Sequence, residues 1–300
     1  MKDPLAETEQ VLARLQTEQP HPETLDLDLL STEEILQRMN DLDHTVAPAV
    51  RRALPQIAQA VEAIVERLEQ GGRLLYFGAG TSGRLAILDA VECVPTFNAP
   101  PGMVRAFIAG GASALVYPVE GAEDDYYGGI KDVQEAGVNV RDVVVGISAS
   151  GRAPYVLGAL EEAKRRGAYT IGLACNRNTA LRIADCVIEV ETGPEVVLGS
   201  TRLRAGTAQK MVLNMLSTAS MVRLGKVFGN LMVDLRATNL KLRARAIRLV
   251  RMATGCSETT ARNVLRSCDW QVKKAILVLL AQISPLEAEM WLEQHRGHLR

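Results

Sequence analysis

The chain has 300 residues, enough for about two domains. Hydrophobic residues make up 47% of it and charged residues 23%, proportions typical of a globular protein with a sizeable core. The net charge is −1 and 4% of the residues are aromatic, which argues against nucleic acid or a membrane surface as a partner. No apolar run approaches the roughly 18 residues that span a bilayer, and the first ten residues lack a signal-peptide core.

The placement of cysteine and histidine limits the chemistry further. Cysteines number five, with no C-x-x-C pair, which predicts reduced thiols and a cytoplasmic location. Histidine occurs only near the two ends, at His21, His44, His295 and His298. A Ser-His-Asp triad or a zinc site built from residues 45–294 is therefore close to excluded. We expect no metal and no cofactor, and carboxylates are the leading candidates for acid–base chemistry.

The first 70 residues predict an N-terminal arm followed by helices. Prolines interrupt residues 1–30, where only a short helix over 5–16 is expected. Ser31-Thr-Glu-Glu34 fits a capping box and predicts a helix that runs toward Asn40. From Leu54 onward apolar residues recur at helical spacing, until Gly71-Gly72 ends the helix.

The period then changes to short buried runs that alternate with helices. Strands are expected over residues 73–77, 103–109, 142–147, 169–174 and 186–190. Four helices are expected with these strands. The first follows the strand at 73–77 and its loop and ends near residue 92, and the others cover 123–136, 153–166 and 206–227. This alternation predicts an α/β fold, a five-stranded parallel sheet with helices on both faces.

After Asn230 no further strand is expected, and four short helices are predicted within 238–294. The chain is thus expected to consist of an N-terminal arm and helix over 1–45, a sheet domain over 46–235 and a small C-terminal all-α bundle over 236–300. Within the bundle, Ala253-Thr-Gly-Cys-Ser257 is expected to open one helix and Asp269-Trp270 to belong to the next.

A basic run over residues 236–251 raises the question of nucleic-acid binding. A solvated helix face is the commoner explanation for such a run, and the net charge near zero favours it.

Two strand-to-helix loops share the pattern G-x-[GS]-x-S-G, Gly78-Ala-Gly-Thr-Ser-Gly83 and Gly146-Ile-Ser-Ala-Ser-Gly151. Glycine-rich loops at a helix start leave backbone N–H groups free, and hydroxyls add further donors, a combination that binds phosphate. Glycines that only let a strand turn into a helix are the alternative. Because both loops follow parallel strands, where open α/β sheets bind ligands, phosphate is favoured. The candidate ligands are Gly80, Thr81, Ser82, Gly83, Ser148, Ser150 and Gly151.

The first loop also matches a dinucleotide fingerprint, but the acidic residue that would hold ribose is absent from the second strand, Val104–Gly111. A Walker A motif fails as well, since Arg84-Leu85 occupies the place of Lys-Ser/Thr. NAD and ATP are therefore both disfavoured.

Three further features are candidates for substrate contact or catalysis. A cluster rich in hydroxyls and cations, 199–210, precedes the last long helix of the sheet domain and includes Lys210. It is either a substrate contact or a solvated helix start. Glu92 has apolar neighbours, which would favour a protonated carboxyl, and Glu123 lies at an expected helix start. By sequence alone each glutamate is more commonly a surface or capping carboxylate.

These motifs resemble the sugar isomerase (SIS) family of phosphosugar-binding domains and, within it, the N-acetylmuramic acid 6-phosphate etherases. The likeness covers about residues 17–298. It is carried by the ordered stretches at 77–85, 88–93, 108–111, 119–124, 143–152, 205–210, 226–234 and 253–256. Two departures are visible: Thr17-Glu-Gln-Pro-His-Pro22 lacks the family's Arg-Asn, and Arg204 stands where a lysine is usual.

The resemblance implies that residues 46–235 form a phosphosugar-binding catalytic domain and that the C-terminal helices resemble a ubiquitin-associated bundle. It implies a carbon–oxygen lyase that converts N-acetylmuramic acid 6-phosphate and water to N-acetylglucosamine 6-phosphate and D-lactate, a step of amino sugar catabolism and cell-wall recycling. Glu92 would be the proton donor and Glu123 the second catalytic glutamate. The expected partners are the small phosphosugar and a second copy of the chain, in a homodimer. A non-catalytic sugar-phosphate-binding regulatory protein is the alternative.

Overall fold

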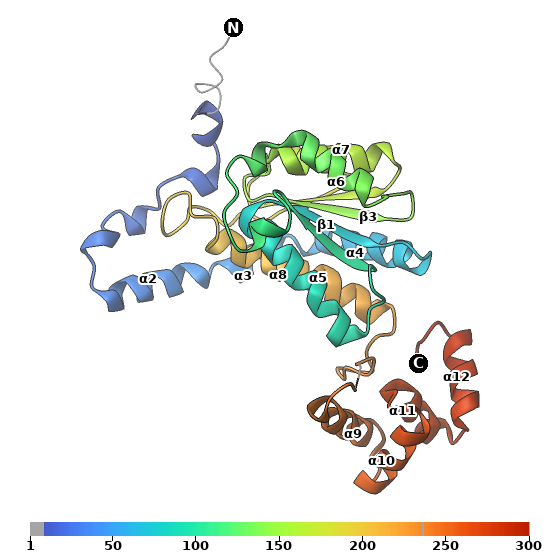
Figure 1. Ribbon diagram of the computed structural model, residues 1–300. Helices are drawn as coiled ribbons and strands as arrows, with labels where there is room; N and C mark the ends of the chain where they lie inside the picture. The colour runs from blue at the N-terminus through green and yellow to red at the C-terminus, as the bar shows by residue number, and fades with distance from the viewer. Residues whose placement is uncertain (1–8, 236, 300) are drawn as a thin grey trace. The chain divides into compact units, whose positions relative to one another are not determined.

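The structure is a computed structural model that describes residues 9–235 and 237–299 (Figure 1). It divides into two compact units, and each is described by itself. The first holds the residues up to Asp89 together with Val104–Leu216, and the second holds Ala90–Met103 together with the residues from Ser217 onward. This grouping differs from the expected boundaries at 45/46 and 235/236, which stay a prediction.

The first unit contains the predicted five-stranded parallel sheet. Its strands are β1 (Leu74–Gly78), β2 (Val104–Ile108), β3 (Val143–Ile147), β4 (Tyr169–Ala174) and β5 (Cys186–Glu189). They lie in the order β2-β1-β3-β4-β5, with every neighbouring pair parallel. The α/β fold expected from the sequence is confirmed.

The helices before and between the strands are α2 (Thr32–Asp43), α3 (Val46–Arg52), α4 (Leu54–Glu69), α5 (Gly80–Phe97), α6 (Tyr126–Glu135) and α7 (Pro154–Arg165), and α8 (Arg204–Arg223) follows the last strand. Helices cover both faces of the sheet, whereas α2 packs on α3 and extends away from the strands (Figure 1). α6 and α7 pack on one face, and α4 lies on the other (Figure 1). The core under α7 joins Leu75 and Phe77 of β1 to Val156 and Leu160. All five residues of β1 and of β3 are buried, as expected for central parallel strands.

The N-terminal elements begin as their sequence predicts. Residues 9–12 are helical, and the earlier part of the expected 5–16 helix lies outside the described residues. The capping box at α2 is present: Ser31 accepts the N–H of Glu34, and the Glu34 carboxylate accepts the N–H of Ser31 at 2.8 Å.

Two helix boundaries near the candidate glutamates differ from expectation. α5 does not end near Glu92 but continues to Phe97, with Pro95 inside the helix. α6 begins at Tyr126 rather than near Glu123, because the Asp125 side chain caps it by accepting the N–H of Gly128 at 2.8 Å. Glu123 lies instead in a separate short 3-10 turn, Ala122–Asp124, which follows a left-handed glycine at 121.

The second unit is helical, with the four expected helices α9 (Leu240–Thr254), α10 (Glu258–Ser267), α11 (Val272–Ala281) and α12 (Pro285–Gln294). Side chains of Asn239, Ser257 and Ser284 cap α9, α10 and α12. Of the stretch expected to open a helix, only Ser257 does so, because Ala253 and Thr254 end α9 and Gly255 follows in the left-handed conformation. Asp269 and Trp270 do not belong to α11 but form the turn before it, where both have positive φ.

The basic run follows the solvated-face interpretation over its described part. Ala246, Ile247, Leu249 and Val250 of α9 are buried, while the α9 cations are exposed. Among the described helices none is by itself long and apolar enough to cross a membrane; α11 and α12 meet that test only together, with a 107° bend between them.

Candidate active site

The two predicted phosphate loops meet at one edge of the sheet. β1 and β3 are direct neighbours, with Gly78 opposite Ile147, and each loop begins where its strand ends. β1 also lies between β2 and β3, which is the point where the strand order reverses. Open α/β sheets bind ligands outside the carboxyl ends of their strands at such a point. The structure therefore brings the two loops together at the expected place.

Glycine is required in the first loop for two reasons. Gly80 has φ of +53°, a left-handed conformation that other residues adopt at a cost. Gly83 packs tightly: an added Cβ would lie 2.6 Å from Ile108 Cγ1 and 2.7 Å from the Gly78 carbonyl oxygen. These contacts hold the start of α5 against the end of β1.

The serine of the first loop is less available than expected. Ser82 is 7% exposed and donates a 2.9 Å hydrogen bond to Gln209 Oε1 of α8. Gln209 Nε2 is buried, and the nearby group to which it could donate is the buried thiol of Cys175. If the Gln209 amide turns over, its Nε2 donates to Ser82 Oγ and the Ser82 hydroxyl hydrogen becomes available to a ligand. Thr81 is half-buried and lies beside Gly206 of α8.

The second loop is organised by its own hydroxyls. Ser148 Oγ accepts the N–H groups of Gly151 at 3.1 Å and Ala153 at 3.4 Å, and it lies 3.3 Å from Ser150 Oγ. When Ser148 donates to Ser150, the half-buried Ser150 keeps its own hydrogen for a ligand. Gly151 has φ of +71°, and an added Cβ would lie 2.4 Å from Thr179 Cβ.

Asn176, just after β4, is a site residue that the sequence analysis missed. Its amide nitrogen donates to the carbonyl of Ala149, between the two loop serines, and to Thr17 Oγ1, both at 3.0 Å. Its oxygen accepts the N–H of Gln16 at 2.8 Å. Thr17 is fully buried, so the N-terminal arm is fixed to the second loop. A polar residue after a parallel strand is a signal that could have identified Asn176.

The start of α8 is held by a buried carboxylate. Glu195 accepts the N–H groups of Arg204 and Ala205, each at 2.9 Å. The pKa of Glu195 is raised, because burial outweighs these hydrogen bonds. Arg204 is buried and donates to Thr45 Oγ1 and to the carbonyl of Pro194. Arg204 thus links the helix start to the N-terminal segment, and burial lowers its pKa.

Two further charged or titratable residues of the first unit are Lys210 on α8 and His21 in the N-terminal arm. Lys210 is exposed, one helical turn beyond Gly206, and so shares the side of α8 on which Gly206 meets Thr81. His21 belongs to the arm segment that departs from the family pattern. Its pKa is lowered first by burial and then by the positive charge of Arg204.

Glu123 is the candidate carboxylate of the first unit. Glu123 is an exposed residue, but protein atoms around its carboxyl group displace enough water to raise its pKa, and the neighbouring charge of Asp124 raises it further. A carboxylate with a raised pKa is a stronger proton acceptor than an ordinary glutamate near neutral pH.

Glu92 belongs to the second unit and lies on an exposed, largely apolar stretch of α5. Leu88 is 54% exposed, Val91 61% and Val94 38%, and Glu92 itself is exposed. Val91 and Val94, its apolar neighbours in sequence, therefore do not enclose Glu92 in the single chain. A helix face of this kind is typical of a surface that another protein covers.

The strand order and the two strand-to-helix loops together are those of a SIS domain, and a SIS domain model matches residues 126–219. The N-terminal SIS domain of glucokinase regulatory protein matches 56–164, and the C-terminal lid domain of that protein matches 229–275. A phosphoheptose isomerase from Neisseria gonorrhoeae, 18% identical, superposes with a TM-score of 0.48 over 63% of this chain and 99% of its own.

Relatives that match nearly the whole chain define its family more narrowly than the domain models do. An N-acetylmuramic acid 6-phosphate etherase of Streptomyces avermitilis is 52% identical over 96% of this chain and 93% of its own length. One from Caldanaerobacter subterraneus is 51% identical over 96% and 94%. The chain belongs to the family of N-acetylmuramic acid 6-phosphate etherases.

Proposed function

We propose that this protein cleaves the D-lactyl ether of N-acetylmuramic acid 6-phosphate with water, giving N-acetylglucosamine 6-phosphate and D-lactate. The observation that carries the proposal is identity above 50% over nearly the whole chain to proteins of that name. The paired loops support it, because they offer hydroxyls and helix N-termini to a sugar phosphate.

The elimination of lactate requires two proton transfers at the sugar. An ether is a poor leaving group, so the ring first opens to the aldehyde, which makes the C2 proton acidic. We assign Glu123 as the base that removes this proton and Glu92 as the acid that protonates the lactate oxygen as the C3–O bond breaks. Water then adds at C3 of the unsaturated aldehyde, giving a proton to Glu92 while Glu123 returns its proton to C2, so that both carboxyl groups regain their starting state. The raised pKa of Glu123 supports its role as base.

The phosphate would be held by the two loops. We assign Thr81, Ser82, Ser148 and Ser150 as hydroxyl donors, with Gly80, Gly83 and Gly151 allowing close backbone approach. Lys210 would add a positive charge from α8. Fixing the phosphate orients C2 and C3 for the two glutamates.

The direct experiment is incubation of the protein with N-acetylmuramic acid 6-phosphate and enzymatic measurement of D-lactate and N-acetylglucosamine 6-phosphate. We expect both products in equal amounts. Binding of the phosphosugar without release of either product would contradict the lyase and favour the regulatory alternative, for which the whole-chain relatives give no support.

A homodimer in the cytoplasm is the second part of the proposal. The apolar side chains on α5, Leu88, Val91 and Val94, are exposed in the single chain, and covering them would also surround Glu92. An isologous two-fold dimer is the commonest way to cover such a face. Light scattering should give twice the chain mass of 32.6 kDa. A fully active species at 32.6 kDa would contradict the dimer.

A further inference from the structure

We propose that a cavity in the second unit binds a small oxyanion through Lys226 and Lys273. The cavity has a volume of about 690 Å³, which is within the usual range for small-molecule sites. Its lining includes none of the residues assigned above to catalysis or phosphate binding. The inference is independent of the proposed function.

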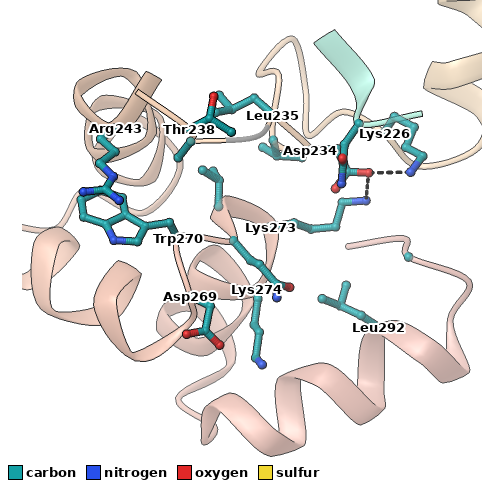
Figure 2. A pocket seen from close by; sticks show the side chains of 16 residues that line it. Lys226, Asp234, Leu235, Thr238, Arg243, Asp269, Trp270, Lys273, Lys274 and Leu292 are labelled. Atoms are coloured by element: carbon teal, nitrogen blue, oxygen red, sulfur yellow. Dashed lines mark ion pairs between the residues drawn. The ribbon is translucent and has the colours of Figure 1, made fainter. Parts of the chain in front are cut away.

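Two lysines share one carboxylate at one end of this cavity. Lys226 Nζ lies 2.9 Å and Lys273 Nζ 3.0 Å from the same Asp234 oxygen, as Figure 2 shows. The side chains of Lys226, Asp234 and Lys273 are 21%, 16% and 9% exposed. Three largely buried groups therefore carry one uncompensated positive charge, an arrangement that is unfavourable without a counterion.

The remaining charges of the cavity do not cancel this surplus. Lys274 also lines the cavity but is balanced by Glu289, 2.8 Å away. Arg243 lies over the Trp270 ring at 5.0 Å from its centroid, and Asp269 is exposed (Figure 2). Among the residues that line the cavity, the cations are Lys226, Arg243, Lys273 and Lys274, and the carboxylates are Asp234 and Asp269. Glu289 lies outside the lining and balances Lys274. One positive charge remains.

The backbone around the cavity adds to its preference for an anion. Lys273 is in the first turn of α11, whose N-cap residue, Gln271, makes no side-chain capping bond. The partial positive charge of a helix start therefore acts beside the ammonium groups. Burial lowers the pKa of Lys273, and the charge of Asp234 partly offsets this effect. A bound oxyanion would stabilise the charged form of Lys273 further.

The turn that carries Trp270 is strained. Asp269 and Trp270 are consecutive non-glycine residues with φ of +50° and +61°. Such conformations are costly and cluster at ligand sites, where the surrounding structure enforces them. Here the turn places the indole ring in the cavity wall, together with Arg243 (Figure 2). The indole is therefore positioned to report on anything that enters.

Tryptophan fluorescence tests the proposal. The chain has two tryptophans, so Trp291→Phe leaves Trp270 as the only reporter. This variant is titrated with inorganic phosphate and, separately, with D-lactate, against sodium chloride of equal ionic strength. We expect a saturable change in Trp270 emission with phosphate, with D-lactate or with both, and the response identifies which oxyanion the cavity accepts.

Two variants of the reporter chain locate the anion. Lys226→Gln removes the surplus charge but leaves Lys273 and Asp234 as a matched pair, and it should weaken binding by on the order of tenfold or more. Lys274→Gln is the matched control, because its charge is already balanced, and it should weaken binding far less. The response should persist when Ser82 and Ser150 are replaced by Ala.

Three results would overturn the proposal. The first is that neither phosphate nor D-lactate gives a saturable change in Trp270 emission beyond that seen with chloride. This result is decisive even if Lys226→Gln fails to fold, because it is obtained with the reporter chain. Another is equal binding by Lys226→Gln and the reporter chain. The third is loss of the response with the Ser82 and Ser150 substitutions, which would assign the signal to the phosphate loops.

Discussion

Replacement of Glu92 by Gln is expected to abolish D-lactate release while phosphosugar binding is retained. The amide keeps the shape of the side chain but cannot protonate the departing lactate oxygen. Loss of one acid–base group costs on the order of 10²–10⁴-fold in rate. The measurement is kcat from the lactate assay, with binding followed separately by calorimetry. Turnover near that of the wild type would show that the acid is another residue.

Hydrogen exchange at C2 distinguishes the two glutamates in this scheme. In deuterated water, Glu92→Gln should still exchange the C2 proton, because Glu123 remains as base, although the C3–O bond is not broken. Glu123→Gln should lose both exchange and lactate release. Glu135→Gln, an exposed glutamate on α6 paired with Lys131, is the control and should behave as wild type. Exchange retained by Glu123→Gln would contradict its assignment as base.

Simultaneous replacement of Ser82 and Ser150 by Ala should raise KM far more than it lowers kcat. Each hydrogen bond lost to a charged phosphate costs roughly 1.5–3 kcal/mol, so the pair should raise KM by about 10²-fold or more. Steady-state kinetics with the phosphosugar measures this change. Ser267→Ala is the control, because Ser267 is exposed and its hydroxyl contacts only near neighbours in sequence, the Val264 carbonyl at 2.9 Å and the Cys268 thiol at 4.0 Å.

The double variant also loses the bond from Ser82 to Gln209, so its thermal unfolding must be compared with that of the wild type. A folded double variant with unchanged KM would move the phosphate anchor elsewhere. The cluster between Arg202 and Lys210 would then be the next candidate.

Local patterns predicted the sheet and the place of its loops well. Strand positions follow from runs such as Leu74–Gly78, which are apolar throughout because both faces are covered. The capping box at Ser31 predicted the start of α2, because its two hydrogen bonds join residues only three positions apart. Both signals are contained within a few residues.

Long-range contacts could not be predicted in this way. Glu195 caps α8 from nine residues upstream of Arg204, and Gln209 meets Ser82 across 127 positions. No local rule assigns such partners, because the fold brings them together. The exposure of Glu92 is a similar case, since the apolar neighbours in its sequence project from α5 into solvent in the single chain.

The bond between Asn176 and Thr17 also has a consequence for synthesis of the chain. The two residues are separated by 159 positions, and the arm is made first. At about 5–20 residues per second, its partner follows roughly 10–30 s later. During that interval Thr17 lacks its native partner. Ala149, whose carbonyl accepts from the same asparagine, is made only 27 residues before it. The contact that joins the arm to the second loop therefore forms only after Asn176 has been synthesised.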